Sequence, residues 1–121
     1  MIEYLKIGRP DHWLKNVFIL FGHMVAVTLV LNFQIGWEQV RLAALSLIPA
    51  CLIASANYIL NEILDAPFDA MHPTKRHRGI PAGKVKIWKL WWMKAGLIVT
   101  AFAFAWLCGF NWAYHAALAL L

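Results

Sequence analysis

The hydrophobic positions of this chain fall into long runs that are separated by short polar segments. The runs cover residues 17–33, 42–64 and 87–110, and a fourth apolar stretch covers residues 112–121. A helix rises about 1.5 Å per residue, so roughly 20 apolar residues cross the hydrocarbon core of a bilayer. The first three runs are therefore predicted to be transmembrane helices, and the fourth is predicted to be the start of another. This pattern predicts an all-α integral membrane helical bundle that forms one domain over residues 1–121.

The composition supports a membrane location and excludes several classes of protein. Of the 121 residues, 62% are hydrophobic and 14% are charged, whereas soluble domains are about 45–50% apolar and 25% charged. Residues 1–16 carry five charged side chains before any apolar run, which is unlike a cleavable signal peptide. The net charge of +5 comes from cations that lie beside the apolar runs rather than on one basic face. No nucleic-acid partner is therefore predicted.

The distribution of cations between the loops predicts an orientation. Three cations precede the first run and six lie within residues 75–89, whereas the loop between the first and second runs holds only Arg41. Membrane proteins keep the loops that are rich in Lys and Arg on the cytoplasmic side. We therefore expect the N-terminus and the 65–86 loop to be cytoplasmic, in a bacterial inner membrane.

An acidic segment follows the second apolar run directly. Asn61, Asp65 and Asp69 are four residues apart, and on a helix this spacing drifts by only about 40° per step, so the three side chains form one stripe. Pro67 disfavours helical geometry at the residue before it. The helix is therefore predicted to kink or end within residues 64–66, with the stripe bending around that end. Carboxylate and amide oxygens are ligands that suit Mg²⁺.

Cations follow the acidic stripe in the same loop. Lys75, Arg76, Arg78 and Lys84 lie within about twenty residues of it, and Lys and Arg are the side chains that bind phosphate or diphosphate. Acids for a metal beside bases for phosphate suggest chemistry on a polyprenyl phosphate or diphosphate in the membrane. Two simpler interpretations stay open. The cations can act only as topogenic residues that pair with the acids, or the loop can bind anionic lipid without catalysis.

Two stretches of this chain carry a resemblance to a known family. The string "NEILDAPFDAMHPTKRHRGIPAGKV" at residues 61–85 resembles the first aspartate-rich motif, NDxxDxxxD, of the UbiA superfamily of intramembrane prenyltransferases. The continuation "HPTKRHR" is most similar to the branch that contains decaprenyl-phosphate phosphoribosyltransferase. The opening "RPDHWLKNVFIL" at residues 9–20 is similar to the N-terminal signature of the same branch. The two signatures occur in the family's order.

The resemblance implies a helical bundle with a central cavity open to lipid and a polar cap on the cytoplasmic side. It also implies roles for individual residues. The expected catalytic residues are Asp65 and Asp69, and the expected ligands of Mg²⁺ and diphosphate are Asn61, Asp65 and Asp69. The expected phosphate-binding residues are Lys75, Arg76 and Arg78, and the residues with a less defined place near the cap are Arg9, Lys15 and Glu62.

In most of the superfamily, Mg²⁺ and basic residues assist the loss of diphosphate from a prenyl donor. In the phosphoribosyl branch the donor is phosphoribosyl pyrophosphate, and a polyprenyl phosphate attacks the anomeric carbon of the ribose. The resemblance therefore favours transfer of phosphoribosyl to a polyprenyl phosphate. The alternative within the same fold is transfer from a prenyl diphosphate to an aromatic or other small acceptor.

The chain departs from the family pattern at three points. Glu62 stands where the motif usually has Asp, and Pro67 lies between the two aspartates. The third departure is that no acid follows Asp69, so the second aspartate-rich motif of the family is missing. We therefore expect the chain to be the N-terminal part of such an enzyme or a truncated relative. In the second case, another chain could supply the missing helices.

Overall fold

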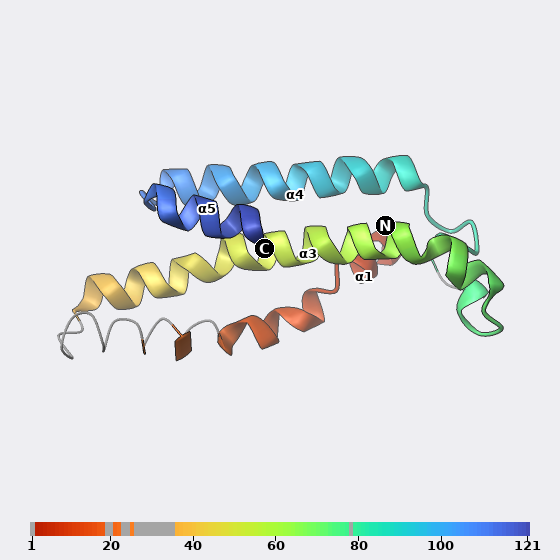
Figure 1. Ribbon diagram of the computed structural model, residues 1–121, viewed down its shortest axis with the longest axis horizontal. Helices are drawn as coiled ribbons and strands as arrows, with labels where there is room; N and C mark the ends of the chain where they lie inside the picture. Colours follow the sequence, from red (N-terminus) through yellow and green to blue (C-terminus); the bar gives the residue numbers. More distant parts are fainter. Residues whose placement is uncertain (1, 19–20, 23–24, 26–35, 78) are drawn as a thin grey trace.

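The computed structural model describes the chain apart from residues 1, 19–20, 23–24, 26–35 and 78 (Figure 1). The described residues form helices and turns, and no strand occurs among them. The elements in order are α1 (Ile2–Ile7), the 3-10 helix η1 (Pro10–Val17), α3 (Trp37–Met71), the 3-10 turn η2 (Lys75–His77), α4 (Ile87–Leu107) and α5 (Trp112–Leu120). Most of the run predicted to span the membrane at residues 17–33 lies outside the described residues.

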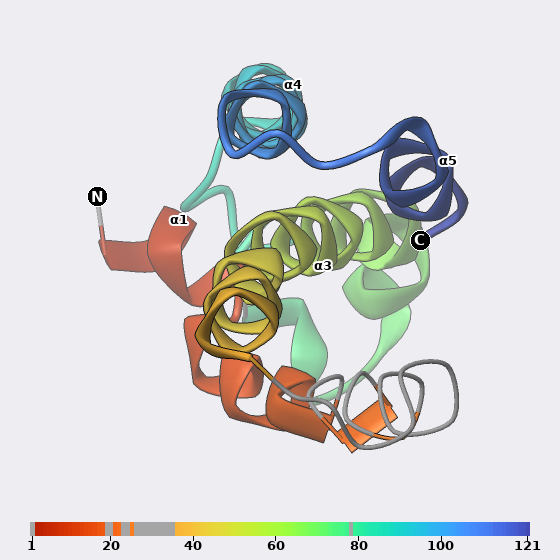
Figure 2. The ribbon, with the colours of Figure 1, turned by 90° about the vertical axis from the view of Figure 1, so that its left-hand side faces the viewer.

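Helix α3 is central to the arrangement. Helix α4 lies along one side of α3 and η1 lies along the opposite side, while α1 lies at the flank of α3 (Figures 1 and 2). Helix α5 folds back towards α3 and α4. By length and composition, α3 and α4 could each cross a membrane. They correspond to the runs predicted at residues 42–64 and 87–110, so the all-α class that the sequence predicts is confirmed.

Two apolar clusters hold the helices together. One cluster lies near the loop between α3 and α4 and contains Ile7, Ile59, Val85 and Leu90. The other lies towards the opposite end and contains Ile53, Ala101, Ala105 and Leu118. The alanines in the second cluster are fully buried. Small side chains of this kind let helix backbones approach closely in a membrane, where the hydrophobic effect does not drive helices together.

The sequence predicts a kink or an end within residues 64–66, and the predicted end is wrong, because α3 continues through Pro67 to Met71. A proline in a helix removes one hydrogen bond and crowds the preceding turn. Here Asp65, Pro67 and Phe68 are exposed, so the proline ring does not disturb the packed core. The helix ends at His72, whose backbone is extended (φ −83°, ψ 132°). His72 precedes Pro73, and the residue before a proline avoids helical geometry.

The end of α4 is also fixed by local chemistry. Gly109 has a φ of +74°, which is the left-handed conformation that glycine adopts readily after a helix. The Phe110 amide donates to the Ala105 carbonyl (3.1 Å) and the Gly109 amide donates to the Trp106 carbonyl (3.0 Å). The side chain of Asn111 then caps α5 by accepting from the Tyr114 amide (3.0 Å). The predicted run at 87–110 therefore divides into a helix that ends at Leu107 and a tight turn.

We expect Leu90→Ala to lower the free energy of unfolding by about 2–4 kcal/mol, because the change removes a fully buried side chain and leaves a cavity. The exposed fraction of Leu90 is 0%. The matched control is Leu107→Ala on the same helix, where the side chain is 83% exposed. Thermal unfolding in detergent measures both. Equal loss of stability in the two variants would contradict the packing described for α4.

Candidate functional site

The acidic stripe lies on the last turns of one continuous helix. Asn61, Asp65 and Asp69 all belong to α3, so the stripe stays on one helix and does not pass around a helix end. At about 1.5 Å per residue, it extends over about 12 Å of the helix. Asn61 and Asp65 are exposed, whereas the side chain of Asp69 is only 18% exposed. The stripe therefore faces open space at one end and the following loop at the other.

The loop after α3 brings a cation to the acidic stripe. The Lys75 Nζ lies 3.3 Å from the Asp69 Oδ1. Arg76 follows Lys75 in η2, and its Nε donates to the His77 Nε2 (3.2 Å). This ion pair between Asp69 and Lys75 is the contact that the simpler interpretation, in which the acids pair with the loop cations, predicts. Arg78, the third predicted phosphate-binding residue, lies outside the described residues.

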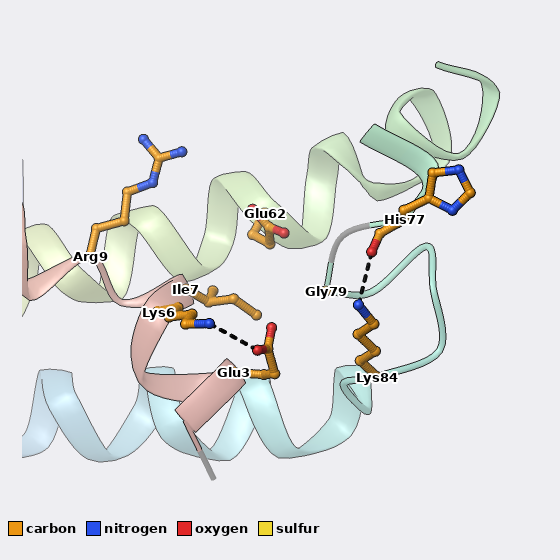
Figure 3. A pocket seen from close by; sticks show the side chains of 8 residues that line it. All are labelled: Glu3, Lys6, Ile7, Arg9, Glu62, His77, Gly79 and Lys84. Carbon is orange, nitrogen blue, oxygen red and sulfur yellow. Dashed lines mark hydrogen bonds and ion pairs between the residues drawn. The ribbon is translucent and has the colours of Figure 1, made fainter. Parts of the chain in front are cut away.

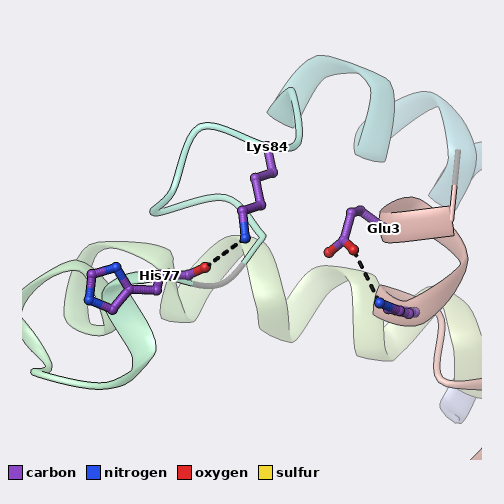
Figure 4. A network of polar contacts seen from close by, with 4 residues as sticks. Glu3, His77 and Lys84 are labelled. Carbon is purple, nitrogen blue, oxygen red and sulfur yellow. Dashed lines mark hydrogen bonds and ion pairs between the residues drawn. The ribbon is translucent and has the colours of Figure 1, made fainter.

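A polar pocket of about 340 Å³ lies beside the acidic stripe, between α1, α3 and the loop before α4 (Figure 3). Its charged lining combines the N-terminal segment with the motif region: Glu3, Lys6, Arg9, Glu62 and Lys84. Two polar contacts order its rim, as Figure 4 shows: Lys6 Nζ donates to Glu3 Oε1 (3.2 Å), and Lys84 Nζ donates to the His77 carbonyl (3.2 Å). The pocket contains three cations and two acids, so it suits an anionic ligand.

The structure separates the predicted residues into two groups. Arg9 and Glu62 both line the polar pocket, although they are 53 positions apart in the sequence. Asp65 and Asp69 lie further along α3 and do not line the pocket. Lys15 is exposed on η1 and is not among the residues that line it. Of the N-terminal signature, Arg9 is therefore the cation that the fold places beside the acidic motif.

Gly79 fixes how closely the loop approaches α3. It is buried and has a φ of +23°, and a Cβ placed on it would lie 3.0 Å from Glu62 Oε1 and 3.6 Å from Ile7 Cδ1. A glycine is required where a backbone is this close to a side chain and φ is positive. No sequence motif predicted this close contact at Gly79. Its position directly after the basic run was the only signal for its role.

We expect Gly79→Ala to displace the loop from Glu62 and to lower the free energy of unfolding by about 1 kcal/mol or more. Thermal unfolding measures the loss, and trypsin cleavage after Lys84 reports the displacement. The control is Gly83→Ala, where the glycine also has a positive φ (+70°) but has no neighbouring atom within 4 Å of an added Cβ. If both variants open the loop equally, backbone strain rather than contact with Glu62 accounts for the effect.

The oxygen ligands of the acidic stripe fit Mg²⁺ by chemistry. Mg²⁺ usually binds one or two carboxylates, keeps several waters and takes its other ligands from substrate phosphates. Asp65 and Asp69, with the amide of Asn61, supply such a partial ligand set on one helix face. Within the described part of the chain, no group of three or more His, Cys, Asp or Glu side chains could hold a metal alone. A metal at this stripe would therefore depend on phosphate oxygens of the ligand.

Comparison with known proteins gives consistent matches. Decaprenyl-phosphate phosphoribosyltransferase of Mycobacterium tuberculosis (strain CDC 1551 / Oshkosh) is 34% identical over 103 residues, which is 85% of this chain and 34% of the relative. The protein of the same name from Mycolicibacterium smegmatis is 30% identical over 84% of this chain and 32% of the relative. Protoheme IX farnesyltransferase of Stenotrophomonas maltophilia is 36% identical over 80% of this chain and 32% of the relative.

The chain thus spans about a third of the length of these relatives. No solved structure shows a significant match to it. The sequence pattern of the UbiA prenyltransferase family matches residues 16–121. This match covers the acidic stripe, the basic loop and both helices that could span a membrane. The chain belongs to the UbiA prenyltransferase family.

Proposed function

We propose that this chain forms the diphosphate-binding part of a membrane transferase that moves phosphoribosyl from phosphoribosyl pyrophosphate to a polyprenyl phosphate. The observation that carries the proposal is the contact between the acidic stripe of α3 and the basic loop, where Lys75 lies 3.3 Å from Asp69. The similarity to decaprenyl-phosphate phosphoribosyltransferases supports the choice of donor and acceptor.

In the proposed mechanism, the donor's diphosphate binds where acids and cations meet. Asp65 and Asp69 would hold Mg²⁺, and the ion would supply positive charge that offsets the charge of the diphosphate. Lys75 and Arg76 donate to the phosphate oxygens. A phosphate oxygen of the polyprenyl acceptor forms the new bond to the anomeric carbon, and the bond from that carbon to the diphosphate breaks. Cations already in place stabilise the leaving group without reorganisation during the reaction.

The polar pocket supplies a second place for donor phosphate. Phosphoribosyl pyrophosphate carries a 5-phosphate as well as the diphosphate, so it needs two anion sites. Arg9, Lys6 and Lys84 line the pocket and can donate to the 5-phosphate. We infer that the donor lies with its diphosphate at Asp69 and Lys75 and its 5-phosphate towards the pocket.

The same proposal includes an orientation in the membrane. Members of the family are integral membrane proteins, and α3 and α4 are long and apolar enough to span. We propose that the loop between them faces the cytoplasm of a bacterial cell, where the water-soluble donor is available. Lys89 and Lys94 near the start of α4 support this side, because cations favour the cytoplasmic interface. The polyprenyl acceptor reaches the site from the bilayer.

A second candidate activity is prenyl transfer from a prenyl diphosphate to a small acceptor. The similarity to a protoheme IX farnesyltransferase favours it, and the acidic stripe would serve a prenyl diphosphate equally well. The polar pocket argues for the first candidate, because a prenyl diphosphate has no second phosphate group at the far end of the molecule to place there.

A donor competition experiment separates these two activities. Membranes that contain the full-length protein encoded by its gene are supplied with Mg²⁺, a polyprenyl phosphate and labelled phosphoribosyl pyrophosphate, or with a labelled prenyl diphosphate and a small aromatic acceptor. We expect a labelled transfer product, separated chromatographically from unreacted donor, only with phosphoribosyl pyrophosphate. Label transfer only from the prenyl diphosphate would contradict the proposed donor.

A further inference from the structure

The 3-10 helix η1 is attached to α3 by a ladder of three polar contacts. His12 Nδ1 lies 3.0 Å from the Tyr58 hydroxyl oxygen, Trp13 Nε1 donates to Ser55 Oγ (2.8 Å), and Asn16 Nδ2 donates to Cys51 Sγ (3.2 Å). Positions rise along η1 as they fall along α3, so the two segments run antiparallel. Ser55 and Cys51 are buried. The three α3 residues are spaced by four and three, which places them on one face of the helix.

Tyr58 makes the ladder contact nearest to the site and has a second role there. Its ring lies beneath the guanidinium of Arg9, with 5.6 Å between the Arg9 Cζ and the ring centroid. The His12 ring packs edge-on against the same ring, with centroids 5.2 Å apart at 78°. One aromatic side chain therefore contacts both residues that bound the first turn of η1.

The backbone at Arg9 needs such support. Arg9 has a φ of +44° and a ψ of 57°. Among the non-glycine residues that the structure describes, Arg9 is the one with a positive φ. A non-glycine residue in this left-handed region is less stable than in ordinary helical geometry and persists when its surroundings fix it. The left-handed turn directs the chain from α1 into η1, and the side chain of Arg9 then lines the polar pocket.

Tyr58 and the acidic motif share a helix face. From Tyr58, the residues Glu62, Asp65 and Asp69 follow at steps of four, three and four, which keeps them within about 60° of one another around the helix. Arg9 lies over Tyr58 and also borders the pocket with Glu62, one turn further along α3. Because Tyr58 is fixed on α3, it sets where Arg9 lies relative to the acids.

We propose that Tyr58 is a positioning residue, which holds the left-handed turn at Arg9 and so keeps the Arg9 guanidinium at the donor pocket. This inference rests on the proposed function for the identity of the ligand. The hydroxyl of Tyr58 fixes His12 and its ring supports Arg9. The hydroxyl can be removed alone in Tyr58→Phe, or together with the ring in Tyr58→Leu.

The kinetic test uses the full-length protein in membranes, with Tyr58→Phe and Tyr58→Leu. Loss of the hydroxyl contact in Tyr58→Phe should raise the KM for phosphoribosyl pyrophosphate about threefold. Loss of the ring as well, in Tyr58→Leu, should raise it about tenfold. We expect kcat to change less than about twofold in both variants, because Tyr58 acts on ground-state binding through Arg9. Tyr114→Phe is the matched control, since its hydroxyl donates to the Ser46 carbonyl (2.7 Å) away from the pocket.

A double variant shows whether Tyr58 acts through Arg9. If it does, Tyr58→Leu should have little further effect on KM once Arg9→Gln is present, because coupled residues are not additive. Multiplication of the two KM effects would overturn the proposal. So would a fall in kcat and in protein yield with KM unchanged, because that result indicates a structural role alone.

A cross-linking experiment tests the docking independently of any activity. In a Cys108→Ser background, Asn16→Cys places a second thiol opposite Cys51, and a short bis-methanethiosulfonate reagent should join the two. Lys15→Cys, at an exposed neighbouring position, is the control and should not cross-link. Adding Tyr58→Leu should slow the cross-link about threefold or more, since a contact that holds η1 is lost.

The two experiments distinguish a failure of this inference from a failure of the proposed function. If the unmodified protein shows no dependence on phosphoribosyl pyrophosphate, the proposed donor is wrong, and the cross-link still reports whether Tyr58 holds η1. An unchanged cross-linking rate in Tyr58→Leu overturns the positioning role, whatever the donor is.

Discussion

Replacing Asp65 or Asp69 with asparagine should lower transfer activity of the full-length protein at least about a hundredfold, because each change removes a charged oxygen from the proposed site of the departing diphosphate. Asparagine keeps the size of the side chain and the helix position. Asp69→Asn also removes the partner of Lys75, which lies 3.3 Å away. The loss should therefore appear in kcat as well as in donor KM. Initial rates at saturating acceptor measure both.

The matched control for these variants lies at the other end of the same helix. Glu38 is exposed and pairs with Arg41 on α3, with 2.6 Å between Glu38 Oε1 and Arg41 Nη2. Glu38→Gln removes the same charge and also breaks an ion pair, although this pair is more exposed than that of Asp69, and an exposed pair of this kind contributes little to stability. We expect unchanged activity in Glu38→Gln. Activity within about twofold of the unmodified protein in both Asp65→Asn and Asp69→Asn would refute the assigned roles, because loss of a functional ligand costs far more.

Neutralising Lys75 and Arg76 together, as Lys75→Gln with Arg76→Gln, should raise the KM for phosphoribosyl pyrophosphate about thirtyfold or more. Each charge-assisted hydrogen bond to phosphate contributes roughly 1.5–3 kcal/mol. Lys75 is held beside Asp69 by the ion pair, so its ammonium lies at the end of the acidic stripe. Donor titrations at fixed Mg²⁺ measure the change in KM.

A charge-matched pair of substitutions separates specific binding from attraction to anionic lipid. Lys89 and Lys94 lie near the start of α4, each beside a tryptophan ring: 5.6 Å from Trp88 and 5.3 Å from Trp91. Lys89→Gln with Lys94→Gln removes the same total charge from the same region. A specific donor site predicts that only the loop pair changes KM. Equal effects of both pairs, each lost in high salt, would favour a basic surface that binds anionic lipid.

The periodicity of the chain predicts the helices well but misplaces their ends. The apolar runs at residues 42–64 and 87–110 correspond to α3 and α4, because length and hydropathy are local properties. The end of α3 was assigned to Pro67, whereas Pro73 ends it. Both prolines lie in a polar segment. The sequence alone does not show which of them the helix accommodates and which of them ends it. Because of this error, the stripe was expected to run past the helix end, whereas all three of its residues lie within α3.

Local residue spacing predicts one part of the candidate site, whereas the other part depends on contacts between segments that are distant in the sequence. The four-residue spacing predicts that Asn61, Asp65 and Asp69 share a helix face, and α3 shows this. The meeting of Arg9 with Glu62 depends on how η1 docks on α3, which no local pattern describes. Tyr58 and Ser55 carry that docking, and both read as ordinary residues of an apolar run. Their position on the same helix face as Glu62 was the feature of the sequence that could have indicated this docking role.

The central claim is that the loop after α3 binds phosphoribosyl pyrophosphate with the help of Mg²⁺, and trypsin protection of this loop tests it most directly. Lys75, Arg76 and Lys84 are exposed cleavage sites, and the experiment compares cleavage in native membranes with and without Mg²⁺, donor and inorganic phosphate. We predict protection by phosphoribosyl pyrophosphate that requires Mg²⁺ and that equal concentrations of phosphate do not reproduce. Cleavage that is indifferent to the donor, or protection that ignores Mg²⁺ and disappears in salt, would contradict the claim.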